Sequence, residues 1–288
     1  MTSLRNSSVP RAVAASAVAA AADASAEEPP PPYLAHGAHN LLIRFEADEA
    51  AIRNLLPPGL QPASNVVTLN MYSVPRALGI PPYTRTYIWA DLKGFDAWDG
   101  TQGRYVLVGW AEPDGFRTIA TRLLHWPAEQ GVTHIEPDRV DEVRATLQVV
   151  GDADLIVARA RRAEGATGQA FANLLPYVFV DEAVLAANRA VKRHDVGINQ
   201  VPFIGTALEL YPLSVDFQVP DGHPLASLRP KRLVGAVEVR DGAFALGVIP
   251  ASGRLALRPA HRSRAPFCFG RSGLVQRPWP EASKHRLA

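Results

Sequence analysis

Short apolar segments separated by turn-forming sequences constrain the fold of this chain more than any other feature. The segments have the composition or the alternation of β-strands, and they cover residues 40–45, 66–74, 83–93, 104–111, 117–124, 145–150, 155–160, 207–211, 213–217, 233–239 and 243–249. Three pairs of neighbours are joined by sequences typical of hairpin turns, namely Glu112-Pro113-Asp114-Gly115, Gly151-Asp152 and Arg240-Asp241-Gly242. We therefore expect an α+β fold that is mainly an antiparallel β-barrel or curved sheet with a few helices.

Two segments have the pattern of helices. Asp48 can cap a helix that runs through Leu56 and ends at Pro57-Pro58-Gly59. A second helix is expected over 182–191. With so few helices among so many strands, connections by hairpins are more consistent with the sequence than repeated crossovers through helices.

Composition excludes several classes of protein. The 288 residues are 47% hydrophobic and carry a formal net charge of +2, so a sizeable core is expected and no global field favours nucleic acid or an anionic membrane. Cys268 is the single cysteine, which excludes intramolecular disulfides and cysteine-rich zinc sites. No run of about 18 apolar residues is present. We expect a cytoplasmic protein with no nucleic-acid or membrane partner.

The two ends of the chain differ from its middle. Residues 1–32 form an Ala-rich leader that ends in Pro29–Pro32, and they are either a disordered tail or a cleaved targeting peptide. We expect the folded domain over 33–252. Residues 253–288 form a basic tail, in which eight basic residues and Glu281 give a net charge of +7. The tail suits an acidic partner or a neighbouring subunit of a homo-oligomer, whereas the net acidic remainder disfavours nucleic acid.

Several short motifs occur in the order found in one known family. Ala51–Leu60 is followed by the segment 66–74, by Pro82-Tyr83-Thr84 and by Thr121–Gly131. Residues 145–163 and Gly222-His223-Pro224-Leu225 continue the order. Over about residues 40–251, the chain resembles the acetoacetate decarboxylase superfamily. The resemblance implies a barrel-like fold around a small pocket, and in typical members a lysine that forms a Schiff base with a β-keto acid.

The chain departs from that family at the reactive position. The family pattern Pro-Lys-Lys-x-Gly corresponds here to Pro127-Ala128-Glu129-Gln130-Gly131. Ala128 cannot form an imine, and a carboxylate at Glu129 would raise rather than lower the pKa of a nearby amine. Two pocket glutamates of the family correspond to Asn70 and Arg85. The resemblance therefore implies a divergent member that lacks the Schiff-base lysine and whose pocket has a different charge.

Strand alternation predicts the walls of this pocket. If Asn70 and Arg85 face it, then Thr68, Tyr72, Tyr87, Trp89, Asp91 and Lys93 share their faces, whereas Leu69, Met71, Ile88, Ala90 and Leu92 pack on the opposite side. The expected substrate-binding residues are Asn70, Tyr72, Tyr83, Tyr87, Trp89, Lys93 and Ala128. In this interpretation Arg85 holds a carboxylate or enolate and an aromatic ring stacks on an unsaturated group. The alternative is a half-exposed strand whose polar face meets solvent.

The expected catalytic residues are Arg85, His125 and Glu129. His125 and Glu129 flank the position of the missing lysine and could act as a general acid and base. The alternative for His125 is a packing role beside Trp126. His36-x-x-His39 and His134-x-Glu136-x-Asp138 lack a third ligand at a fixed spacing, so we expect no metal and no cofactor.

The leading functional hypothesis is a small-molecule, lyase-like enzyme. It would act on a carbonyl or carboxylate compound by acid/base and electrostatic catalysis without a Schiff base. One alternative is a non-catalytic member of the same fold that binds a small acid. Another is a secreted or organelle-targeted binding module in which the basic tail makes the contacts.

Overall fold

The computed structural model describes residues 31–247, apart from 97–99, 123, 138–140, 150–152, 188 and 221–222. Most of the expected leader and the whole expected basic tail lie outside the described residues. The strands are β1 Tyr33–Glu46, β2 Pro62–Val74, β3 Arg76–Leu78, β4 Tyr83–Leu92, β5 Arg104–Glu112, β6 Glu129–Gln130, β7 Val132–Pro137, β8 Glu142–Val149, β9 Ala153–Arg162, β10 Gln169–Val180, β11 Val196–Phe217 and β12 Arg232–Leu246. The helices are α1 Glu49–Leu55, α2 Asp114–Arg122, α3 Glu182–Ala186 and α4 Pro224–Ser227, with a 3₁₀ turn at Arg193–Asp195.

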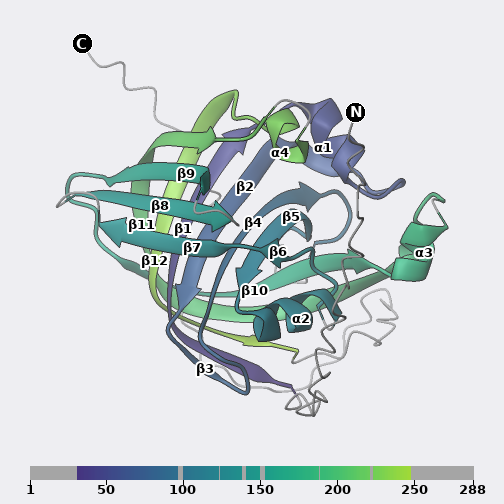
Figure 1. Ribbon diagram of the computed structural model, residues 1–288, viewed down its shortest axis with the longest axis horizontal. Coiled ribbons are helices and arrows are strands. Elements are labelled where there is room, and N and C mark those ends of the chain that lie inside the picture. The colour runs from purple at the N-terminus through teal and green to yellow at the C-terminus, as the bar shows by residue number, and fades with distance from the viewer. Residues whose placement is uncertain are drawn as a thin grey trace, which may run out of the picture.

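All these strands belong to one strongly curved sheet (Figure 1). Its order is β10-β5-β4-β2-β1-β12-β11-β9-β8-β7, and β10 also pairs with β11. That extra pairing closes the first seven strands into a barrel. Pairing is antiparallel except for β10 with β5 and β5 with β6. The predicted α+β fold, mainly an antiparallel β-barrel or curved sheet with few helices, is confirmed.

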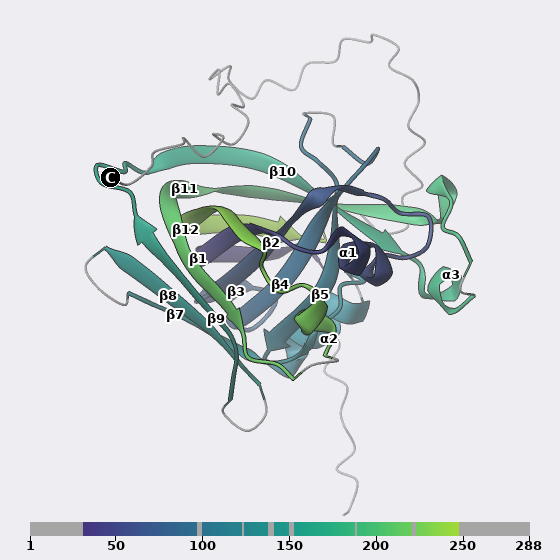
Figure 2. The ribbon, with the colours of Figure 1, turned by 90° about the horizontal axis from the view of Figure 1, so that it is seen from above.

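The three strands at the end of this order, β9, β8 and β7, leave the barrel and fold back over it. β11 pairs with β10 through its first half and with β9 through its second half. Figure 2 shows β7, β8 and β9 on one side of β1 and β12, with β10 on the other side. Two apolar clusters result, one inside the barrel and one between the outer face of the barrel and β7–β9. We call them the inner core and the outer core.

The central strands serve both cores through their alternating side chains. On β2, Leu69 and Met71 belong to the outer core, whereas Tyr72 belongs to the inner core. On β4, Ile88 packs in the outer core and Tyr87 in the inner core. The alternation predicted for these strands is therefore confirmed.

The helices bear out the sequence in part. Asp48 caps α1 by accepting from the backbone N–H groups of Ala50 and Ala51, as expected. The strand predicted over 117–124 is wrong, because this segment lies largely in α2. Phe116, Ile119 and Ala120 recur at helical spacing and are buried on one side of that helix. The helix expected over 182–191 is limited to the short α3.

Two further expected connections differ in the structure. Arg240-Asp241-Gly242 makes no hairpin, because β12 runs straight through it with Asp241 at φ 50°. A left-handed residue followed by glycine accommodates an irregularity within a strand as well as a turn between two strands. The two strands predicted over 207–217 are parts of the single strand β11. The antiparallel pairing of β8 with β9 is confirmed, whereas the expected turn at Gly151-Asp152 lies outside the described residues. None of the helices described is long and apolar enough to cross a membrane.

Candidate functional site

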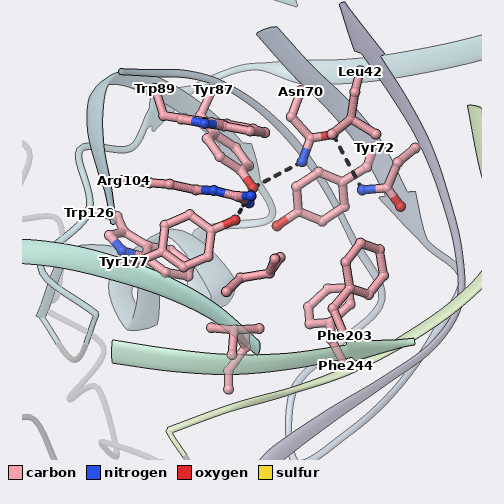
Figure 3. Close-up of a pocket in the computed structure, with 14 residues that line it drawn as sticks. Leu42, Asn70, Tyr72, Tyr87, Trp89, Arg104, Trp126, Tyr177, Phe203 and Phe244 are labelled. Carbon is pink, nitrogen blue, oxygen red and sulfur yellow. Dashed lines mark hydrogen bonds between the residues drawn. The ribbon is translucent and has the colours of Figure 1, made fainter. Parts of the chain in front are cut away.

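The interior of the barrel contains a small cavity of about 40 Å³. Aromatic rings form most of its wall, and polar groups gather at one part of it (Figure 3). Its lining residues are Asn40, Leu42, Asn70, Tyr72, Tyr87, Trp89, Arg104, Trp126, Leu175, Tyr177, Val201, Phe203, Phe244 and Leu246. They come from β1, β2, β4, β5, β10, β11 and β12 and from the loop after α2. The closed barrel thus brings together side chains that are far apart in the sequence.

A chain of hydrogen bonds crosses four strands along the wall of this cavity (Figure 3). Asn40 Nδ2 donates to Asn70 Oδ1 at 3.3 Å, and Asn70 Nδ2 donates to the Tyr87 hydroxyl at 2.9 Å. The hydroxyls of Tyr87 and Tyr177 are 2.8 Å apart. All four side chains line the cavity. The chain therefore presents an ordered row of polar groups to whatever the cavity holds.

Arg85 is not among the residues that line the cavity, but it contacts two of them, Tyr87 and Trp126. It is fully buried, with 0% of its surface exposed. The centre of its guanidinium is 4.3 Å from the centroids of both the Tyr87 and the Trp126 rings. Its Nε and Nη2 atoms are buried and form no hydrogen bond with the residues described. Aromatic faces offset only part of the cost of burying a cation. Positive charge is thus held against the cavity wall without a carboxylate partner in the described chain.

A second cation, Arg104, lies in the wall itself (Figure 3). Its guanidinium is 4.9 Å from the centroid of the Trp89 ring, and its Nε is 4.0 Å from Asp91 Oδ1. Trp89 Nε1 also donates to that Asp91 oxygen, at 3.1 Å. Asp91 therefore partly neutralises Arg104 and orients Trp89.

Trp126 reaches the cavity because its loop lies directly on β5. A Cβ atom at Gly109 would be 2.5 Å from the carbonyl oxygen of Pro127, so only glycine permits this approach. The backbone N–H of Trp126 donates to the Ala120 carbonyl at 2.8 Å, which ties the loop to the end of α2. His125, just before it, takes a positive φ of 53°. The backbone thereby places the Trp126 ring against Arg85.

Burial keeps Tyr72, Tyr83 and Tyr87 protonated at neutral pH. Desolvation raises the pKa of Tyr87 and of Tyr83 well above the usual value of 10. It also raises the pKa of Tyr72, although the charge of Arg85 opposes that shift. Neutral phenols donate hydrogen bonds. The cavity therefore offers O–H donors and a nearby positive charge, an arrangement suited to an anionic or carbonyl oxygen.

The structure brings together four of the residues expected to bind substrate. Asn70, Tyr72, Tyr87 and Trp89 line the cavity. Tyr83 lies in the same inner core without lining the cavity, and its ring stacks on Phe116 with centroids 3.6 Å apart.

The remaining expected site residues lie away from the cavity lining. Lys93 and Glu129 are exposed, and Ala128 packs against the inner core. His125 is half-buried and stacks on Phe179, with ring centroids 4.7 Å apart. Conversely, the sequence analysis missed several lining residues, among them Asn40, Arg104, Trp126 and Tyr177. Only Trp126 was in a segment already singled out by a motif.

A different cluster of charges surrounds Glu238 on the outer side of the barrel. Its carboxylate is fully buried and accepts from His39 Nε2 at 2.8 Å, Arg240 Nε at 2.8 Å and Arg162 Nε at 3.3 Å. These residues come from β1, β9 and β12 and border a second, open cavity. Both carboxylate oxygens are satisfied. The cluster joins β9 to the barrel, and we call it the Glu238 cluster.

Solved structures with the same architecture have little sequence in common with this chain. The enduracididine biosynthesis enzyme MppR complexed with pyruvate is 15% identical, with a TM-score of 0.56, over 77% of this chain and 91% of that one. An acetoacetate decarboxylase from Legionella pneumophila is 13% identical, also with a TM-score of 0.56, over 75% of this chain and 85% of that one. These likenesses show a shared fold.

Sequence comparison identifies the family. Among curated proteins, none matches the chain. The family model described as acetoacetate decarboxylase, however, matches residues 17–243, which is well over half of the 288 residues. The match includes all of the described strands except the last three residues of β12. The chain therefore belongs to the acetoacetate decarboxylase family.

Proposed function

We propose that this protein is a lyase-like enzyme that acts on a small carbonyl or carboxylate compound by acid/base and electrostatic catalysis, without a Schiff base. The observation that carries the proposal is the burial of Arg85 beside the cavity with two nitrogen donors unused. A buried, unpaired cation is costly in an isolated protein. A bound anion would offset that cost, and a protein that keeps such a charge gains affinity and selectivity for anions.

The cavity itself supports chemistry without an imine. No lysine is among the residues that line it in the part of the chain that the structure describes. In this proposal, Ala128 and Glu129 stand where the family pattern has its two lysines. In place of an amine, the site offers Tyr87 and Tyr177 hydroxyls and the cationic Arg85 and Arg104. In the proposed mechanism, the hydroxyls donate to a carbonyl oxygen and stabilise it as negative charge develops during bond cleavage. The positive charges of Arg104 in the wall and of Arg85 beside it attract the carboxylate.

One observation favours the alternative, a non-catalytic member that binds a small acid. The described lining residues include no carboxylate and no histidine. Glu129 is exposed, and His125 is occupied in stacking on Phe179. A reaction that needs a strong general base would therefore lack one in the cavity wall. A reaction that releases carbon dioxide needs no base for the bond-breaking step. A lone pair of the carboxylate forms the second C=O bond of carbon dioxide, the C–C bonding pair passes to the neighbouring carbonyl as an enolate, and water or a tyrosine hydroxyl then protonates that enolate.

Two measurements on the same sample test this proposal. The protein is incubated with a panel of small keto acids, and product is followed by nuclear magnetic resonance, with carboxylate binding followed by calorimetry. Turnover with at least one keto acid supports an enzyme, whereas saturable binding with all acids recovered unchanged supports the binding protein. In parallel, borohydride is added in the presence of acetoacetate, and the intact mass should stay unchanged. A covalent adduct at Lys93 or at any other lysine would overturn the Schiff-base-free mechanism.

A further inference from the structure

The hydrogen-bond chain along the cavity wall has a direction. Asn40 donates to Asn70, and Asn70 donates to Tyr87. Since the Tyr87 oxygen already accepts from Asn70, its own proton is available to Tyr177 at 2.8 Å. A chain in which each member donates to the next is favoured by mutual polarisation. The chain runs from Asn40 to Tyr87, and either hydroxyl can be the donor in the last bond, between Tyr87 and Tyr177.

Counting protons shows what the tyrosine end of this chain offers. Tyr87 and Tyr177 have two hydroxyl protons between them, and their mutual hydrogen bond uses one. Burial raises the pKa of Tyr87 well above its usual value, so its proton is present at neutral pH. The pair therefore has one O–H that the chain does not consume. That O–H can donate to a ligand.

The asparagine end of the chain offers a hydrogen-bond acceptor instead of a donor. Asn40 is 3% exposed and lines the cavity. Its amide donates to Asn70, but its Oδ1 atom is buried and accepts no hydrogen bond from the residues described. Leaving a buried acceptor unsatisfied is costly. A complementary ligand would therefore donate a hydrogen bond to Asn40 Oδ1.

Resting on the proposed function, we infer that the ligand of this cavity is a hydroxy acid, a small carboxylate that carries a free hydroxyl group. The positive charge of Arg85 and Arg104 selects the carboxylate. The hydroxyl donates to Asn40 Oδ1, and an oxygen of the ligand accepts from the tyrosine pair. A simple keto acid has only acceptors at neutral pH and would satisfy one end of the chain. The unsatisfied oxygen of Asn40 thus favours hydroxy acids over keto acids, although the carboxylates of both classes are attracted equally by the arginines.

Calorimetric titration with three acids of one carbon skeleton tests this inference. The probes are butanoate, 3-oxobutanoate and each enantiomer of 3-hydroxybutanoate. One enantiomer of the hydroxy acid should bind at least about tenfold more tightly than butanoate, because a hydrogen bond to a buried acceptor has that value. Equal affinities would overturn the inference while leaving anion binding in place. Tighter binding of 3-oxobutanoate would overturn it too. That result would mean that the side-chain amides of Asn40 and Asn70 are rotated by 180°, so that Asn40 presents an N–H donor to the ligand instead of an oxygen. If none of the acids binds, the proposed function itself fails.

Two variants locate the effect. Asn40→Leu keeps the side-chain volume and removes the acceptor, so the preference for 3-hydroxybutanoate over butanoate should fall to about onefold. Leu42→Val changes the same wall two residues further along β1 and should keep the preference. Preserved preference in Asn40→Leu would place the hydroxyl elsewhere and overturn the assignment. If that variant fails to fold, the wild-type titrations alone decide.

Discussion

Arg85 and Glu238 are both fully buried ionisable residues, yet their surroundings differ in kind. Glu238 accepts hydrogen bonds from two arginines and a histidine, which satisfy both of its oxygens. Arg85 lies between two aromatic rings, with Nε and Nη2 bonded to no described residue. Glu238 lies on the outer face of the barrel and Arg85 on the inner face.

The difference indicates which charge serves the fold and which serves a ligand. A buried charge whose partners all come from the protein completes a structural contact, as the Glu238 cluster does between β9 and the barrel. A buried charge without a partner in the protein destabilises the fold by its desolvation free energy, which a bound counter-ion can offset. On this view, removal of each residue should change different properties of the protein.

The largest effect on stability is expected for Glu238→Gln. The variant keeps the shape of the side chain but removes the negative charge that Arg162 and Arg240 contact, so the free energy of unfolding should fall by about 3 kcal/mol. Denaturant unfolding measures the change. Carboxylate affinity should stay the same, because the cluster lies outside the inner cavity. The exposed Asp216 on β11 gives a control, since Asp216→Asn should change stability by less than about 0.5 kcal/mol. If Glu238→Gln leaves the free energy of unfolding unchanged, the Glu238 cluster does not stabilise the fold and the contrast with Arg85 fails.

Arg85→Met should have the opposite profile. Replacing an unpaired buried cation with an apolar side chain of similar length should leave the protein as stable or more stable. Affinity for small carboxylates should fall by about 1.5–3 kcal/mol, which is more than tenfold. Arg85→Glu should reject anions more strongly still, because it adds repulsion. Thermal unfolding and calorimetry give the two readouts, with the exposed Arg53→Met as control. Loss of stability with unchanged anion affinity would show that Arg85 is structural.

The smallest effect concerns the tyrosines near Arg85 and appears only at high pH. The folded-state pKa of Tyr87 lies well above the unfolded value of about 10, so the unfolded state loses its proton first as the pH rises. Stability should be constant below about pH 10 and fall above it. Tyr87→Phe should make that fall shallower by up to about 1.4 kcal/mol per pH unit. Tyr211→Phe, at an exposed position, should leave the slope unchanged. Equal slopes in all three proteins would mean that Tyr87 is not buried in solution.

Sequence patterns predicted the faces of individual strands better than the partners across the barrel. Alternation correctly placed Tyr87 in the inner core and Ile88 in the outer core, because side-chain direction along a strand is a local property. Asn40, Arg104 and Tyr177 could not be found in this way. They approach Asn70, Trp89 and Tyr87, respectively, only because the barrel brings together strands that are far apart in the sequence, which one sequence does not reveal.

The local errors have a different cause. Pro113-Asp114-Gly115 has the composition of a turn, but it precedes the amphipathic series of Phe116, Ile119 and Ala120, and the helix prevails because that series is buried on one side. Gly242 illustrates the reverse case. A Cβ atom there would be 3.1 Å from the Ala38 carbonyl oxygen, so the glycine serves the close approach of β1 to β12 rather than a hairpin. In both cases tertiary packing decides between two locally allowed structures.

The two-faced strands β2 and β4 have a consequence for how such a protein can diversify. On β2, Leu69 and Met71 pack in the outer core, while the residues that alternate with them, Asn70 and Tyr72, face the cavity. Substitutions at the second pair can therefore alter charge and ligand choice while the packing of the first pair is retained. A barrel of this kind can acquire new chemistry one alternate residue at a time and keep its architecture, consistent with solved structures that share its fold at only 13–15% identity.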